Sequence, residues 1–236
     1  MYFRAHAISH GIPPGELPSI LEIARMVEVR DANNHVLGKW SPMRLPISSM
    51  QTFRKLCNDY NVEYDSVNLE HAYTIGERPF KEEVIAKSGL LPGARETLDF
   101  LVSKGDECHL ATKGEDEVQS MKLRVLGVYD EPWFRNGRGH RIDIVDVKDA
   151  ALYRRIAQGY KPENVWVVGD SMASEVLPGL EAGFNVIHIE GMPIPLFNKP
   201  KFMPDPNTYI QMKSIGEIKD KYDALINGGG RSIIKP

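Results

Sequence analysis

The feature that most constrains the fold of this chain is the segment 165–175, whose sequence is VWVVGDSMASE. A short run of Val and Trp between polar residues predicts a fully buried strand of a parallel sheet. The run ends in Gly-Asp-Ser, so the Asp170 carboxylate and the Ser171 hydroxyl emerge at the carboxyl edge of that strand. Open α/β sheets bind their ligands at this edge. The segment therefore predicts an α/β fold with a polar site at one strand end.

A second carboxylate, Glu175, follows Asp170 one turn into the next predicted helix. Two carboxylates this close repel each other unless a cation or a lysine lies between them. Proteins bind Mg²⁺ through one or two carboxylates, and substrate phosphate completes its oxygen ligands. Asp170 and Glu175 are therefore candidate metal ligands. The alternative is an ordinary strand–turn–helix in which Asp170 is the N-cap.

Two further candidate positions lie upstream. Residues 108–114 form another short apolar run, which ends in Thr112, Lys113 and Gly114. The Thr112 hydroxyl and the two following amides would cradle phosphate oxygens at the start of the next helix. Lys148 begins a helical pattern and would place a positive charge over a phosphoryl group. The alternatives are a threonine in an ordinary turn and an exposed lysine at a helix start.

The segments that contain Thr112, Lys148 and Asp170 follow one another along the chain in an order that resembles the haloacid dehalogenase superfamily of phosphatases and related hydrolases. The resemblance covers roughly residues 90 to 220. In that family the second motif ends in Thr or Ser, as at Thr112, and the third is a lysine, as at Lys148. The fourth is an acidic pair, as at Asp170 and Glu175, although the family usually has Asp at the latter position. The resemblance implies an α/β fold with a Rossmann-like parallel sheet core, helices on both faces and a small helical cap. It also implies Mg²⁺ as the cofactor and a small phosphorylated substrate.

The resemblance further implies phosphoryl transfer through an aspartyl-phosphate, with Thr112, Lys148 and Asp170 in the catalytic set. The family's first motif, Asp-x-Asp, supplies the nucleophile and the general acid, and no Asp-x-Asp precedes Thr112. We therefore expect a hydrolase that is truncated at its N-terminus or inactive as given. The alternatives are a non-catalytic binding or regulatory protein of the same fold, and Asp31 as the nucleophile.

The segment around Asp31 makes a poor buried strand, because Glu28 and Arg30 would be unpaired charges in the core. Its alternation about Asn33 and the next residue predicts an exposed β-hairpin near 26–40.

In the family, the strand that carries the first motif lies between the strands that end at Thr112 and Asp170. Backbone groups left unpaired in a core are costly. We therefore expect a strand to fill this position in a folded chain, either residues 25–31 or a segment of a partner.

The chain divides into two compositional zones. Residues 1–88 hold amphipathic helical patterns punctuated by prolines, which predicts a helical cap subdomain. Residues 89–227 alternate helix and strand patterns, which predicts βαβ units and a parallel sheet. Five prolines predict a long loop over 191–207, and the glycines at 228–230 predict a flexible tail over 228–236.

Composition excludes several classes of partner. The chain has 236 residues, 42% of them hydrophobic, and a net charge of −3, which gives no electrostatic case for nucleic acid or an anionic membrane. No apolar run is long enough to span a bilayer. The two cysteines, Cys57 and Cys108, lack metal-ligand spacing and are predicted to be reduced packing residues, which favours a cytoplasmic protein.

Overall fold

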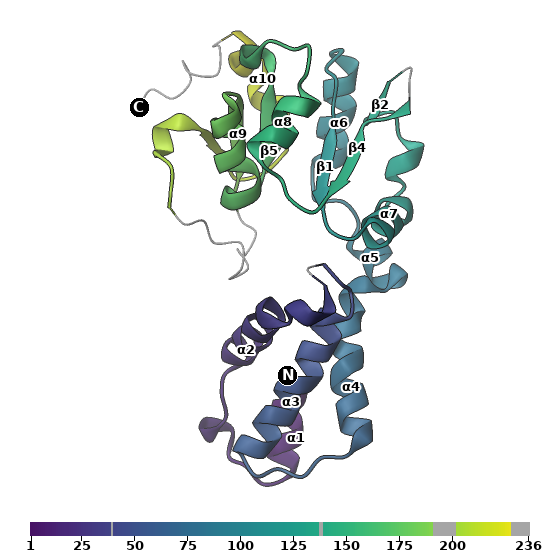
Figure 1. Cartoon of the computed structure of the whole chain (residues 1–236), viewed down its shortest axis with the longest axis vertical. Helices are drawn as coiled ribbons and strands as arrows, with labels where there is room; N and C mark the ends of the chain where they lie inside the picture. The colour runs from purple at the N-terminus through teal and green to yellow at the C-terminus, as the bar shows by residue number, and fades with distance from the viewer. Residues whose placement is uncertain (39, 137–138, 191–201, 228–236) are drawn as a thin grey trace. The chain divides into compact units, whose positions relative to one another are not determined.

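The protein is described by a computed structural model that covers residues 1–38, 40–136, 139–190 and 202–227 (Figure 1). The chain divides into two compact units, Met1–Lys87 and Ser88–Pro236. The predicted flexible tail and most of the predicted long loop lie outside the described residues.

The first unit is helical. α3 is its central helix and packs against α1, α2 and α4. Aromatic rings from α1 and α3 form its core, where Phe3 and Phe53 meet edge to face with ring centroids 6.3 Å apart. The helices are α1 (Tyr2–Ser9), α2 (Ile20–Asn33), α3 (Arg44–Asp59), α4 (Ser66–Glu77) and α5 (Glu82–Ser88).

The predicted hairpin near 26–40 is wrong, because most of this segment belongs to α2. Ser19 and Glu22 form a capping box that starts the helix, and it continues to Asn33. Ile23 and Met26 are three residues apart and pack together against the core, which is helical rather than strand spacing.

Asp31 therefore lies within a helix and not at a strand end. Arg44 binds it through an ion pair with 3.1 Å between Nη2 and Oδ2. Burial raises the pKa of the Asp31 carboxyl, and the Arg44 charge opposes that rise. The interpretation of Asp31 as a family nucleophile is not compatible with this position, and residues 25–31 supply no strand to the sheet.

The second unit alternates helices and strands, as the sequence predicts. Its α/β fold class is confirmed, with parallel strand pairs and several helices. The elements are α6 (Ala94–Ser103), β1 (Leu110–Lys113), α7 (Asp116–Val125), β2 (Arg135–Asn136), β3 (Gly139–His140), β4 (Ile142–Val145), α8 (Ala150–Ile156), β5 (Trp166–Gly169), α9 (Leu177–Ala182), β6 (Asn185–Ile189), β7 (Ile210–Met212) and α10 (Glu217–Asn227).

The parallel strands form two separate groups (Figure 1). β1 pairs with β4, with Leu110 opposite Ile142. β5 pairs with β6, and β6 pairs with β7. Among the described strands, none pairs with the second edge of β1 or with the second edge of β5. The strands that end at Thr112 and Asp170 are thus not hydrogen-bonded to each other, as expected if a strand position between them is open.

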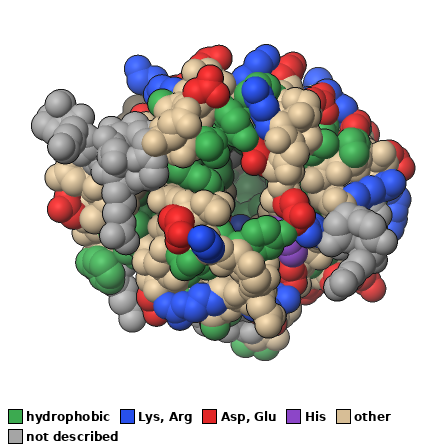
Figure 2. Space-filling model, turned by 90° about the horizontal axis from the view of Figure 1, so that it is seen from above, with side chains coloured by type: hydrophobic (Ala, Val, Ile, Leu, Met, Phe, Trp, Pro, Cys, Tyr) green, Lys and Arg blue, Asp and Glu red, His purple; other side chains and the backbone are tan. Residues whose placement is uncertain are grey.

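Strands with a neighbour on both sides are more buried than strands with a neighbour on one side. The central residues of β6, which has neighbours on both sides, are buried. Every residue of β1 is only half-buried, and Val168 in β5 is 38% exposed. Strands of a parallel sheet with both neighbours present are normally buried on both faces. Figure 2 shows hydrophobic side chains reaching into a hollow near the middle of the face that it presents.

Cys57 and Cys108 are free thiols. Burial raises the pKa of both to about 11, so both are protonated at neutral pH. In the described part of the chain, no helix combines the length and the apolar character that crossing a membrane requires.

The close approach of α3 and α4 depends on a glycine. A Cβ atom at Gly76 would lie 2.6 Å from the Cα atom of Pro46, which is backbone and cannot move aside cheaply. Gly76→Ala should destabilise the helical unit by about 1–3 kcal/mol through overpacking. Gly15→Ala is the matched control, because its Cβ would meet nothing within 4 Å.

Urea unfolding followed by circular dichroism measures both variants. Equal stability of Gly76→Ala and Gly15→Ala would show that α3 and α4 do not pack this closely.

Candidate functional site

The turn after β5 directs its polar groups inward. Ser171 accepts a hydrogen bond at Oγ from the amide of Ser174, with 3.2 Å between the atoms. A π-helical turn follows over Met172–Val176, and the Val176 amide donates to the Ser171 carbonyl at 3.2 Å. This wide turn buries Glu175, whose Oε2 accepts from the Ser171 amide at 2.9 Å. π-Helical turns occur frequently at functional sites.

Lys148 and Glu175 form a buried ion pair. Lys148 lies after β4, and its Nζ is 2.5 Å from Oε1 of Glu175. The two side chains are only 13% and 8% exposed, respectively. Either charge would be costly to bury without the other. The pair also joins the β1–β4 group to the β5–β6–β7 group.

Ser174 is a second junction between the two groups. Lys113, at the end of β1, donates from Nζ to the Ser174 Oγ at 2.8 Å. The Tyr153 hydroxyl on α8 donates to the Ser174 carbonyl at 2.9 Å. Burial, and then the nearby Glu175 carboxylate, raise the pKa of Tyr153, so it remains a protonated donor. The carboxyl ends of β1 and β5 therefore meet at one place.

Thr112 and Gly114 adjoin Gln119 on α7. The Thr112 hydroxyl donates to Oε1 of Gln119 at 3.1 Å. Gly114 is buried with a φ of +153°, and a Cβ atom there would lie 2.4 Å from Nε2 of Gln119. The positive φ favours glycine here, and a larger residue would displace the end of the Gln119 side chain that holds Thr112.

Asp170 is exposed at the end of β5. Its carbonyl accepts a hydrogen bond from Nε2 of buried His188 at 3.1 Å, which fixes the backbone at the strand end. Both oxygens of Glu175 already have partners, namely Lys148 and the Ser171 amide.

The donors present do not fit a complete Mg²⁺ site. In the described residues, no three His, Cys, Asp or Glu side chains gather closely enough to hold a metal ion. Asp170 alone offers an uncommitted carboxylate there, whereas Mg²⁺ demands an octahedral set of oxygens. Metal binding by Asp170 and Glu175 therefore stays a prediction.

The structure brings most of the predicted site residues into one neighbourhood. Contacts link Lys113, Lys148 and Glu175 directly or through Ser174. The sequence reasoning did not identify Ser174 or Gln119. Ser174 could have been proposed as a site residue, because it directly precedes Glu175 in the sequence. Nothing in the sequence indicates that Gln119 would contact Thr112.

Comparisons with known proteins support the fold. No family model matches the chain. The crystal structure of a haloacid dehalogenase-like family hydrolase from Xanthomonas campestris is 19% identical, with a TM-score of 0.61, and the match covers 98% of this chain and 87% of that one. The hydrolase YfnB from Bacillus subtilis, bound to magnesium, is 18% identical with a TM-score of 0.51, covering 94% and 91%.

A curated relative also matches in sequence. The pyrimidine 5'-nucleotidase PynA of Streptococcus pneumoniae (strain ATCC BAA-255 / R6) is 26% identical over 157 residues, which are 63% of this chain and 62% of the relative. The match thus spans less than two thirds of that relative. Together the comparisons show that this chain has the haloacid dehalogenase-like fold, as the order of its motifs predicts.

Removing one partner of the buried ion pair should destabilise the protein. Glu175→Ala should cost roughly 3–5 kcal/mol of unfolding free energy, because Lys148 would be left buried without a counter-charge. Replacing both, as Lys148→Met with Glu175→Leu, should recover most of the loss.

Asp59→Ala is the matched control, since it breaks the exposed Lys55–Asp59 pair and should cost at most about 1 kcal/mol. A double-mutant cycle from urea unfolding gives the coupling energy. A coupling of Lys148 with Glu175 no larger than that of Lys55 with Asp59 would contradict a buried pair.

Proposed function

We propose that this chain binds the phosphoryl group of a small phosphorylated molecule at the carboxyl ends of β1 and β5. The observation that carries the proposal is the gathering of two lysines, Lys113 and Lys148, at this edge, where they contact the neighbouring residues Ser174 and Glu175. Carboxyl edges of parallel sheets are where open α/β folds bind ligands.

Each group has a defined part in this proposal. Lys148 supplies a positive charge whose position Glu175 holds, and phosphoryl oxygens attract it electrostatically. The Thr112 hydroxyl turns from Gln119 to donate to a phosphoryl oxygen, and the Gly114 backbone permits close approach. Lys113 exchanges its Ser174 hydroxyl for a ligand oxygen. Glu175 acts as a positioning residue in this arrangement.

A hydrolase of the kind that these motifs resemble would act by Mg²⁺-dependent phosphoryl transfer. In this proposal Asp170 supplies one metal ligand, and a carboxylate nucleophile is required in addition. The chain contains no Asp-x-Asp for that role. We therefore propose that it binds phosphorylated ligands without hydrolysing them, and that it works in the cytoplasm, where its free cysteines stay reduced.

The proposed ligand class is a nucleoside monophosphate or a molecule of similar size. Its support is the partial match to a protein named as a pyrimidine 5'-nucleotidase. The alternative is a non-catalytic regulatory protein of this fold that binds partners through its helical unit rather than phosphorylated ligands at the sheet edge, and one observation favours it. Both lysines of the site already have partners within the chain, Glu175 for Lys148 and Ser174 for Lys113.

Metal affinity and activity provide the test. Titration calorimetry should show Mg²⁺ binding no tighter than millimolar, because one free carboxylate is a weak site for this ion. Hydrolysis of p-nitrophenyl phosphate and of uridine monophosphate should stay at background. A variant extended at its amino end by an engineered apolar strand ending in Asp-x-Asp should gain Mg²⁺-dependent hydrolysis. Asp170→Asn should then abolish the gain.

Asp31→Asn in the extended variant is the matched control and should leave the gained activity intact. Hydrolysis by the unextended chain that Asp31→Asn abolishes would overturn the proposal. Absence of uridine monophosphate binding, both with and without the extension, would support the regulatory alternative.

A further inference from the structure

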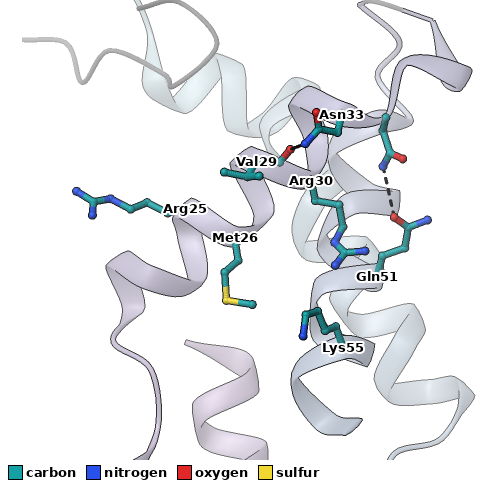
Figure 3. Close-up of a pocket in the computed structure, with 8 residues that line it drawn as sticks. Arg25, Met26, Val29, Arg30, Asn33, Gln51 and Lys55 are labelled. Carbon is teal, nitrogen blue, oxygen red and sulfur yellow. Dashed lines mark hydrogen bonds between the residues drawn. The ribbon is translucent and has the colours of Figure 1, made fainter. Parts of the chain in front are cut away.

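A pocket of about 560 Å³ lies in the helical unit, between α2 and α3 (Figure 3). Its lining includes three cationic side chains and three side-chain amides, and it includes no carboxylate. The lining residues are Arg25, Met26, Val29, Arg30, Asn33, Asn34, Gln51 and Lys55. A pocket of this size matches those that hold small organic ligands.

Arg30 is the central cation of the pocket. Its side chain extends from α2 toward α3, on the side of Gln51 and Lys55, whereas Arg25 points away from them (Figure 3). The Nε atom of Arg30 is buried and has no hydrogen-bond partner in the described structure. A buried donor without an acceptor is unfavourable, so a shift of the Arg30 side chain that brings this atom to a ligand oxygen would relieve the cost. The neighbouring Asp31 carboxylate is bound to Arg44 instead.

Lys55 and Gln51 provide further donors on α3. Lys55 pairs with Asp59 at 2.5 Å, but both side chains are nearly half exposed. Such surface pairs contribute little, so the lysine can turn to a better acceptor. Gln51 accepts at Oε1 from the side-chain amide of Asn34 at 3.4 Å, and its own amide nitrogen points away from Arg30, so the side chain would turn to donate to a ligand (Figure 3). Three types of donor from two helices thus line the pocket.

The remaining lining is apolar. Met26 and Val29 lie on α2 beside Arg30, and Val29 is 48% exposed. A bare inorganic anion would leave this surface in contact with water. A ligand with both an anionic group and an apolar part would cover it and gain from its burial.

We propose that this pocket is an anion-binding site for a phosphate monoester with an apolar organic part. The guanidinium of Arg30 binds two phosphate oxygens, because its planar fork matches phosphate geometry. Lys55 and the Gln51 amide bind the remaining oxygens, and Met26 and Val29 contact the organic part. The site lies wholly within the helical unit and does not depend on the proposed function of the sheet edge.

Phenyl phosphate is the probe, titrated into the ¹⁵N-labelled full chain and followed by amide chemical shifts. Saturable shifts should appear at Arg30, Gln51 and Lys55, and inorganic phosphate should bind more weakly than phenyl phosphate. Ligand binding at the sheet edge would shift Gly114 and Ser174 instead, so the two sites are read separately. No saturable shift in α2 or α3 at about 10 mM ligand, which detects millimolar affinity, would overturn the proposal.

Variants test the assigned donors. Arg30→Gln should weaken phenyl phosphate binding by about tenfold or more, because a charge-assisted hydrogen bond to the phosphate is lost. Lys55→Gln should weaken it by roughly threefold, and its exposed position makes it safe for folding. Arg54→Gln is the matched control, since Arg54 is an exposed cation on the same helix outside the pocket. Equal weakening by Arg54→Gln and Lys55→Gln would show non-specific charge attraction and would also overturn the proposal.

Discussion

Two polar side-chain contacts cross the interruption in the sheet of the α/β unit. Within the described residues, β1 and β5 share no backbone hydrogen bonds, yet their carboxyl ends meet. The Lys148–Glu175 ion pair and the Lys113–Ser174 hydrogen bond cross this interruption. Because the ion pair is buried, it imposes a definite geometry on the turn after β5. The same groups that join the strands are therefore the groups that form the proposed site.

The sequence predicted the elements of the α/β unit well, because short apolar runs that end in polar residues are typical of buried parallel strands. It misjudged residues 26–40, where alternation about an Asn-Asn pair resembled a hairpin. The capping box at Ser19 and Glu22 was the stronger local signal, since it satisfies the first free amides of a helix. The short strand β7, Ile210–Met212, was missed because it follows a proline-rich segment and has only three residues.

The sequence singled out residues that the structure brings close together, but it indicated only some of their contacts, and their roles stay predictions. Thr112, Lys148 and Glu175 were identified from the order of the motifs. Because Asp170 and Glu175 are close in sequence and would repel each other, a cation or a lysine near them was expected, and Lys148 contacts Glu175. The bond of Thr112 to Gln119 depends on how α7 packs against β1, which local sequence does not encode. The cationic pocket between α2 and α3 could not be anticipated, because it depends on α2 being a helix.

Hydrogen exchange measures the central claim, that β1 and β5 face each other without pairing. The amides of Leu110 and Gly114 bond to β4, so alternation along the strand directs the Ala111 amide to the open side. In β5, the Val165 carbonyl accepts a hydrogen bond from Asn185 of β6, so the backbone groups of Val165 face β6. By the same alternation, the Val168 amide, three residues later, faces the open edge of β5. Exchange by NMR should be much faster at Ala111 and Val168 than at the central amides of β6. Equal protection of all these amides would contradict the account, because it would require a continuous sheet.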